Sequence, residues 1–248
     1  MFEPRVALAS LSGRSDAAWA RAQAEHVGAA FLGGVALDGP SRRAAGELVA
    51  RGREEFLPED PVAFVEAELA ALDGEPLRAG VNVRSTTLDP VREAARVCAD
   101  RGAMLEVNAH CRQEELCAVG CGETLLRDTD RLAAFVAAAA DEGAEVSVKV
   151  RAEVPGVDLA ETARAVEEAG AAAVHVDAMD TESSVREVAD AADLFVVANN
   201  EVRGRASVRE YLAYGADAVS VGRASDDPAV LSRVREAVDE WVADETPQ

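Results

Sequence analysis

The stretch Gly143-Ala144-Glu145-Val146-Ser147-Val148-Lys149-Val150-Arg151 decides the fold of this chain. It follows the helical run Asp130–Glu142 and alternates apolar with polar residues, which is the pattern of a β-strand. Glycine just past a helix end favours the left-handed conformation that closes the helix and turns the chain into the next strand. This order of helical run, Gly-Ala and short apolar strand occurs five times, at Gly28, Gly102, Gly143, Gly170 and Gly215. Such a repeat predicts an α/β fold with a parallel sheet.

Strand-like and helical segments alternate along all 248 residues. The strand candidates are Val6–Leu11, Ala29–Leu32, Ala79–Val83, Met104–Asn108, Val146–Val150, Ala173–Val176, Leu194–Ala198 and Ala218–Val221. Helical spacing covers Ser41–Arg51, Pro61–Leu72, Pro90–Asp100, Asp130–Glu142, Leu159–Ala169, Val208–Tyr214 and Pro228–Ala243. Eight such units fill the length of about 250 residues that is typical of a (β/α)₈ barrel. We therefore predict one TIM-barrel domain over residues 1–248, because no linker or shift in composition divides the chain.

The composition is strongly acidic, with 46 Asp and Glu against 25 Lys and Arg and a net charge of −21. Such a charge ordinarily argues against nucleic-acid partners, because Lys and Arg carry phosphate binding. However, 24 of the 25 basic residues are Arg, and uniform acidity with almost no lysine is typical of adaptation to a salty cytoplasm. We therefore expect a halophilic, cytoplasmic protein that has no membrane segment or leader, and whose net charge says little about its partner. The sequence leaves the oligomeric state open.

The single lysine, Lys149, lies inside a strand-like run, where a charged side chain is costly unless it has a task or a partner. A TIM barrel carries its active site at the carboxyl ends of the strands. Two of the three histidines and this lysine fall in that ring of strand ends, which predicts an enzyme. The ring comprises Ser10, Ser12, Gly33, Gly34, Asn82, Arg84, Asn108, His110, Cys111, Lys149, Arg151, His175, Asp177, Asn199, Asn200, Glu201, Gly222 and Arg223.

Three cysteines, Cys111, Cys117 and Cys121, fall within eleven residues next to His110. Their spacing lacks the C-x₂-C pair of common zinc sites, so we predict no metal centre, although a metal or iron–sulfur site stays open as an alternative. A cysteine at the mouth of a barrel, flanked by cationic residues, can serve as a nucleophile or a general acid. Cys111 follows the fourth strand between His110 and Arg112 and is the best candidate for that role.

The last two strands end in Asn199-Asn200-Glu201 and Gly222-Arg223. TIM barrels often bind a phosphate at this position, on backbone N–H groups of the loops. Gly222 permits close approach of the backbone, and Arg223 supplies positive charge. We therefore predict a phosphate site here.

The stretch Val107-Asn108-Ala109-His110-Cys111-Arg112, followed without a gap by Leu116, Gly122 and Leu125-Leu126, resembles the dihydrouridine synthase family. That family has an Asn-x-Gly-Cys-Pro motif and a Gly-x-x-Leu-Leu motif at the same offsets. The resemblance extends from about Val6 to Ala224. It implies a flavin-dependent TIM barrel that reduces uracil in tRNA, with FMN as cofactor and NADPH as reductant.

The resemblance also implies roles for individual residues. Cys111 falls on the cysteine that protonates the uracil ring, and His110 joins it as a catalytic candidate. The flavin-binding positions of the family correspond to Asn82, Lys149, His175, Asn199, Asn200, Gly222 and Arg223. Asn108, Arg112 and Arg151 are the candidates for substrate binding.

The chain departs from the family pattern in the loop after the fourth strand, where Glu114 and Glu115 are also acidic, and at its C-terminal end. Gly-Cys-Pro is His110-Cys111-Arg112, so the loop differs in shape and charge. The chain also stops after one terminal helix, without the helical tRNA-binding domain of the family. This departure puts a tRNA partner in doubt and keeps two alternatives open. One is a flavin barrel that acts on a small pyrimidine or enone, and the other is a barrel without flavin that binds phosphate or metal.

Overall fold

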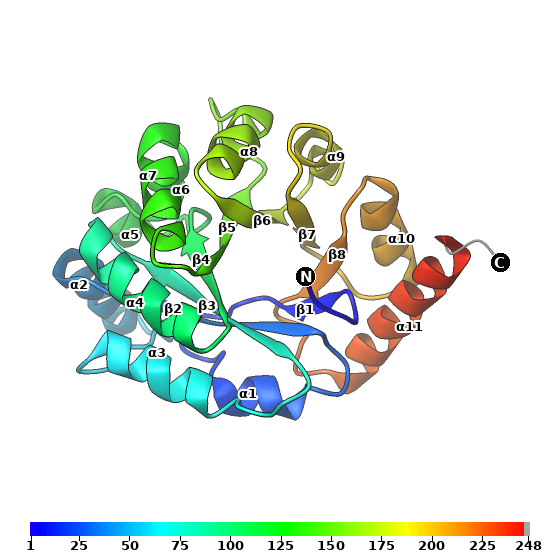
Figure 1. The fold of residues 1–248 in the computed structure, drawn as a ribbon, viewed down its shortest axis with the longest axis horizontal. Helices are drawn as coiled ribbons and strands as arrows, with labels where there is room; N and C mark the ends of the chain where they lie inside the picture. Colours follow the sequence, from blue (N-terminus) through cyan, green and yellow to red (C-terminus); the bar gives the residue numbers. More distant parts are fainter. Residues whose placement is uncertain (246–248) are drawn as a thin grey trace.

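The computed structural model describes residues 1–245, and their eight strands form one closed parallel barrel in the order β1 to β8. Figure 1 shows the strands at the centre and the helices around them. The strands are β1 Val6–Leu8, β2 Ala29–Ala36, β3 Arg78–Arg84, β4 Met104–Asn108, β5 Glu145–Arg151, β6 Ala171–Asp177, β7 Phe195–Asn199 and β8 Ala218–Val221. The predicted TIM barrel is confirmed.

Eleven helices are present in the described residues. They are α1 Ala17–Ala22, α2 Gly39–Ala50, α3 Pro61–Ala70, α4 Leu88–Asp100, α5 Glu114–Ala118, α6 Glu123–Leu126, α7 Thr129–Ala140, α8 Leu159–Glu168, α9 Ser184–Ala189, α10 Arg205–Ala213 and α11 Pro228–Glu245. Asp38, Asp60, Asp128 and Asp158 each accept a backbone N–H at the start of a helix. These caps satisfy donors that the first helical turn leaves unpaired. Within residues 1–245, no helix combines the length and apolar character needed to cross a membrane.

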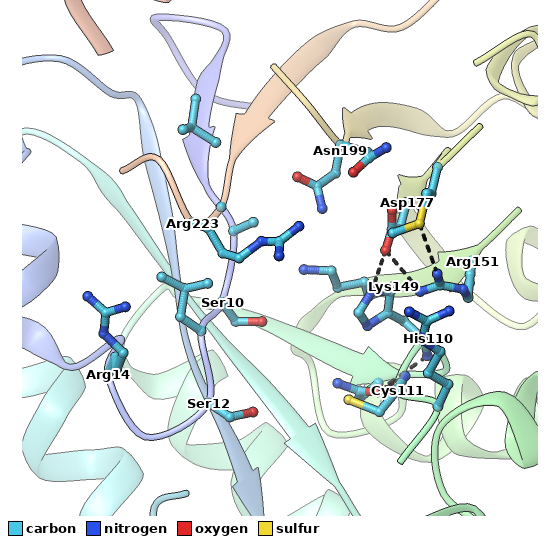
Figure 2. Close-up of a pocket in the computed structure, with 18 of the residues that line it drawn as sticks. Ser10, Ser12, Arg14, His110, Cys111, Lys149, Arg151, Asp177, Asn199 and Arg223 are labelled. Carbon is cyan, nitrogen blue, oxygen red and sulfur yellow. Dashed lines mark hydrogen bonds and ion pairs between the residues drawn. The ribbon is translucent and has the colours of Figure 1, made fainter. Parts of the chain in front are cut away.

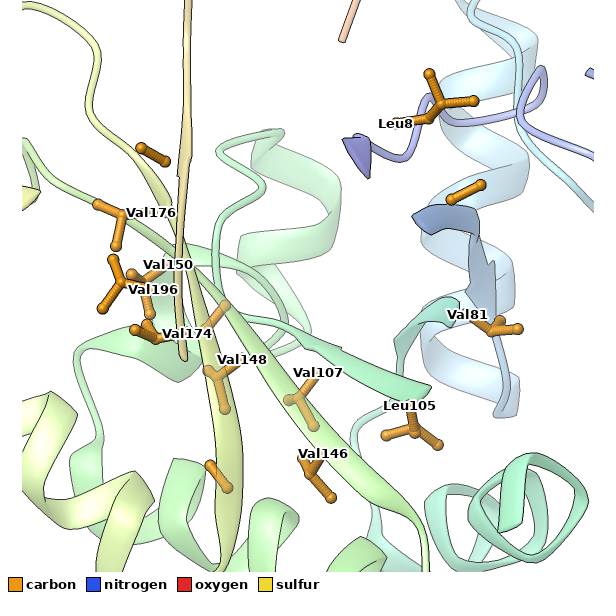
Figure 3. Packing of buried hydrophobic residues seen from close by; sticks show 14 of the residues in the cluster. Leu8, Val81, Leu105, Val107, Val146, Val148, Val150, Val174, Val176 and Val196 are labelled. Atoms are coloured by element: carbon orange, nitrogen blue, oxygen red, sulfur yellow. The ribbon is translucent and has the colours of Figure 1, made fainter. Parts of the chain in front are cut away.

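The strands pack their outward-facing valines and leucines against the helices (Figure 3). The residues labelled there are Leu8, Val81, Leu105, Val107, Val146, Val148, Val150, Val174, Val176 and Val196, and all are nearly or completely buried. Burying one such side chain stabilises the fold by about 1.5–3 kcal/mol. Because strand side chains alternate between faces, the residues between these valines point into the barrel.

Most predicted strand ends lie within two residues of the observed ones, and the ends of β1 and β2 differ by more. β1 stops at Leu8 rather than Leu11, so residues 9–12 form a loop at the barrel mouth. β2 continues to Ala36 rather than ending at Leu32, because the strand passes Gly33 and Gly34 through a shift of register against β3. A Cβ on Gly34 would lie 2.6 Å from Asn82 Oδ1, so a larger residue there would displace the Asn82 side chain.

The repeated glycine has the predicted left-handed conformation at Gly102, Gly143, Gly170 and Gly215, with φ between 63° and 99°. The prediction is wrong for Gly28, which is absent from the positive-φ glycines. A Cβ there would lie 2.2 Å from the carbonyl oxygen of Pro4, so close packing of the N-terminal segment requires glycine at this position.

Candidate active site

The interior of the barrel changes from apolar to polar to charged along its axis. At the amino-terminal end, Phe31 and Met104 pack in a small buried apolar cluster. The next layer inside the barrel consists of fully buried polar side chains from β3, β4, β5, β6 and β8, namely Asn82, Glu106, Ser147, His175 and Ser220. At the carboxyl ends lie Arg84, Asn108, Lys149, Arg151, Asp177 and Asn199. Strand register therefore brings the charged groups to the barrel mouth, as expected for an active site on this fold.

A cavity of about 660 Å³ opens at this mouth. Ten of the twelve predicted site residues line it: Asn108, His110, Cys111, Arg112, Lys149, Arg151, Asn199, Asn200, Gly222 and Arg223. The other two, Asn82 and His175, are fully buried beneath it. Figure 2 shows Cys111, His110, Asp177 and Arg151 on one wall, Ser10, Ser12 and Arg223 on the other, and Lys149 extending into the space between them.

The Cys111 thiol is buried but lines the cavity. Burial raises its pKa, whereas the Arg84 guanidinium and the neighbouring His110 side chain lower it more, so the pKa falls to about 6. Arg84 forms a buried ion pair with Glu55, with 2.6 Å between Nη1 and Oε2. The backbone N–H of Cys111 donates to Asn108 Oδ1 at 3.1 Å. Because a thiolate is the reactive form of cysteine, Cys111 is chemically the most active thiol here.

His110 completes a group with Cys111 and Asp177. Its Nε2 lies 2.6 Å from Asp177 Oδ2, and Arg151 Nη1 donates to the same oxygen at 3.3 Å. Burial lowers the pKa of His110, but the bond to Asp177 and the neighbouring Cys111 side chain together outweigh burial and raise it overall. His110 can therefore hold a proton beside the Cys111 thiolate.

The other cysteines of this region have different surroundings. Cys121 Sγ donates to the carbonyl of Ser85, and burial raises the pKa of this thiol to about 12. Cys117 Sγ donates to the carbonyl of Cys111 at 3.5 Å. No group of three His, Cys, Asp or Glu side chains in residues 1–245 is arranged to hold a metal ion.

Lys149 is 3% exposed, and its side chain forms no hydrogen bond or ion pair within the described part of the chain. The Lys149 charge acts on Glu106 and Asp177, but a buried ammonium without a direct hydrogen bond is costly, so Lys149 is available to a ligand in the cavity. At the ends of β7 and β8, Arg223 is exposed, and Asn199 and Asn200 are half-buried with no side-chain hydrogen bond among residues 1–245. These donors are free to contact a ligand.

Glu106 is the main residue that sequence reasoning missed. This fully buried carboxylate on β4 accepts from Asn82 Nδ2 at 2.7 Å and lies 2.7 Å from His175 Nδ1. Burial raises its pKa, but the nearby His175 and Lys149 outweigh burial, so the pKa is lowered and Glu106 is ionised. The signal that identified Lys149, a charged residue inside a strand-like run, was also present at Glu106.

The chain matches the model of the family described as dihydrouridine synthase (Dus) over residues 75–248. An uncharacterized protein of Methanocaldococcus jannaschii is 26% identical over 233 residues, covering 90% of this chain and 89% of that protein. The tRNA-dihydrouridine synthase B of Xanthomonas axonopodis pv. citri is 28% identical over 169 residues. That match covers 61% of this chain and 50% of the Xanthomonas protein.

Solved structures resemble the fold at low sequence identity. A mutant (M276A) of FabK from Thermotoga maritima has a TM-score of 0.61 at 16% identity, covering 90% of this chain and 63% of FabK. A chain of the tryptophan synthase complex from Pyrococcus furiosus has a TM-score of 0.59 at 14% identity, covering 98% of this chain and all of that one. These likenesses establish the barrel fold alone. The family match spans more than half of the sequence, and the chain therefore belongs to the dihydrouridine synthase family.

Proposed function

We propose that this protein is an FMN-dependent oxidoreductase that reduces the C5=C6 bond of a uracil ring, with tRNA uridine as substrate, NADPH as reductant and Cys111 as general acid. The observation that carries the proposal is the meeting of Cys111, His110 and Lys149 in one cavity. Family membership supports a flavin, and the name of the Xanthomonas relative suggests the substrate.

The donors of the cavity fit a flavin mononucleotide. Lys149 supplies a buried cation without a direct hydrogen bond or ion pair among residues 1–245, which suits the flavin ring, since a cation there stabilises the anionic reduced form. Arg223 and the backbone of Gly222 suit its phosphate. The polar atoms of Asn82 and His175 already have hydrogen-bond partners inside the barrel, so we propose that these two residues support the floor of the flavin site.

Saturating a C=C bond consumes a hydride and a proton. FMN supplies the hydride when it is bound, and Cys111 supplies the proton to the neighbouring carbon. Because the pKa of Cys111 is about 6, the thiol is mostly ionised at neutral pH and needs a proton before it can act as an acid. His110 holds that proton beside the sulfur, so we propose that the two side chains deliver it together.

The charge around the cavity supports a substrate that carries phosphate. Although the chain has a net charge of −21, the cavity is lined by eight basic residues and only three acidic ones. The basic residues are Arg14, Arg53, Arg84, Arg112, Lys149, Arg151, Arg203 and Arg223, and the acidic ones are Glu54, Asp177 and Glu201. Such a local excess of positive charge attracts nucleotides and nucleic acids.

The test adds FMN to the purified full-length chain and follows the visible absorption of bound flavin. NADPH and a tRNA transcript, uridine monophosphate or free uracil are then supplied, and the saturated ring is detected by mass spectrometry. We expect flavin uptake and dihydrouridine in the tRNA. A protein that takes up no flavin contradicts the cofactor assignment, and reduction of the small pyrimidines alone contradicts the tRNA assignment.

A further inference from the structure

A continuous chain of hydrogen bonds crosses the barrel floor beneath the Cys111 loop. Five side chains from β8, β6, β4 and β3 form it, and it ends at backbone N–H groups of the loop after β4. Ser220 Oγ lies 2.7 Å from His175 Nε2, and His175 Nδ1 lies 2.7 Å from Glu106 Oε2. Asn82 Nδ2 donates to Glu106 Oε1 at 2.7 Å, and Asn108 Nδ2 donates to Asn82 Oδ1 at 2.8 Å. Asn108 Oδ1 then accepts from the backbone N–H of Cys111 at 3.1 Å and of His110 at 3.3 Å.

The charge on Glu106 sets the direction of the links from Asn82 to the Cys111 loop. An ionised carboxylate can only accept, so Asn82 must turn its Nδ2 towards it and its Oδ1 away. Asn108 must then donate to Asn82, which leaves Asn108 Oδ1 to accept from the loop. If the two amides were reversed, Asn108 would present N–H groups to the N–H of Cys111, and donors that face each other cannot bond.

We propose that Glu106 is a positioning residue that acts through Asn82 and Asn108 to hold the Cys111 loop in its reactive geometry. The loop has little freedom on its other side, since a Cβ on Gly122 would lie 2.0 Å from the carbonyl oxygen of Cys111. Glu106 acts on Cys111 only through these hydrogen bonds, and its role in catalysis rests on the proposed function.

The loop geometry matters because the Cys111 thiolate depends on charges that come from different elements. Arg84 from β3 and His110 from the loop itself face the sulfur and stabilise its ionised form. Lys149 from β5 lies near His110, and Asp177 from β6 holds His110 in place. A loop that shifts away from Arg84 and His110 loses their stabilisation, so the pKa of Cys111 rises towards its ordinary value.

The test measures the pH dependence of iodoacetamide alkylation in the full-length chain, which requires neither flavin nor substrate. Trypsin cleaves after Arg101, Arg112 and Arg127, so Cys111 lies in peptide 102–112, separate from Cys98 and from the other two cysteines. Mass spectrometry therefore reports the alkylation of Cys111 alone. The wild-type rate should reach half its maximum near pH 6, because the thiolate is the form that reacts.

In Glu106→Gln, the side-chain amide can either donate to or accept from Asn82, so the direction of the hydrogen bonds between this residue and the Cys111 loop is no longer fixed. We expect the midpoint of alkylation to move to higher pH, the rate at pH 6 to fall about fivefold, and the plateau rate at high pH to stay within about twofold. Asn82→Ala removes the hydrogen bonds of Asn82 to Glu106 and Asn108 and should also move the midpoint of alkylation to higher pH. This variant tests the proposal if Glu106→Gln does not fold.

The matched control is Glu145→Gln, at the amino-terminal end of β5, where Glu145 pairs with Arg78 far from the loop. This variant should keep the wild-type midpoint. A general loss of packing would instead accelerate alkylation of the buried Cys98 and Cys121. An unchanged Cys111 midpoint in both Glu106→Gln and Asn82→Ala overturns the proposal, and so does an equal shift in Glu145→Gln. Neither result bears on whether the protein binds flavin or reduces uracil.

Discussion

The two walls of the cavity are built in opposite ways. On the β3–β4 side, Asn82, Asn108 and Cys111 are buried and joined by hydrogen bonds, and Gly122 has no room for a Cβ. On the β7–β8 side, Arg223 is exposed, and a Cβ on Gly222 would meet only Ala9 Cβ at 4.0 Å. The two asparagines of the first wall have their hydrogen bonds inside the protein, whereas the second wall leaves donors free. We infer that the β3–β4 wall holds reacting groups in fixed positions and that the β7–β8 wall binds the cofactor phosphate.

The largest effect should come from Cys111→Ser on the fixed wall. A general acid contributes about 10²–10⁴-fold to a reaction rate, and a serine hydroxyl is a far weaker acid than this thiol. We expect reduction of the substrate to slow by that factor while FMN uptake stays unchanged, measured by product mass and by flavin absorption. Cys117→Ser is the matched control, since Cys117 only donates to the carbonyl of Cys111. Equal turnover in the two variants would show that Cys111 is not the acid.

A smaller effect should follow from Arg223→Gln on the open wall. A hydrogen bond to a charged group contributes about 1.5–3 kcal/mol, so FMN affinity should fall about 10- to 100-fold. Titration of the protein with FMN, followed by flavin fluorescence, measures this change. The control is Arg205→Gln, because Arg205 is exposed but pairs with Glu240 outside the cavity. If both variants bind FMN as tightly as the wild type, the phosphate does not lie at this wall.

The smallest effect should appear in a pair of glycine variants that compares the walls directly. Gly122 has a φ of 59°, and a Cβ there would lie 2.0 Å from the carbonyl oxygen of Cys111. We expect Gly122→Ala to cost about 2 kcal/mol of unfolding free energy, which lowers Tm by about 4–8 °C. Gly222→Ala should leave the free energy of unfolding within about 0.5 kcal/mol.

Thermal unfolding followed by circular dichroism measures both glycine variants. A loss of stability in Gly222→Ala that matches the loss in Gly122→Ala would contradict the difference between the walls. In that case the β7–β8 loops would be as tightly packed as the Cys111 loop.

Much of the site could be predicted because a parallel barrel gathers the carboxyl ends of its strands. Once the strands were identified, Lys149, Arg151 and Cys111 were expected at one mouth, and all three line the cavity. Arg84 and Asp177 belonged to the same ring of strand ends, but nothing in the sequence tied them to a partner. The structure places Arg84 beside Cys111 and Asp177 against His110, across 67 residues of sequence.

The sequence by itself determined the order of helices and strands and the barrel they close. These features depend on local periodicity and on glycines at helix ends, and both can be read from residues that are close together in the sequence. Only the tertiary structure decided that Glu106 lies between Asn82 and His175, the latter 69 residues away. A buried carboxylate is stable only among donors from other strands, and which strands supply them depends on register and closure. The direction of the hydrogen-bond chain to Cys111 is therefore a property of the closed barrel.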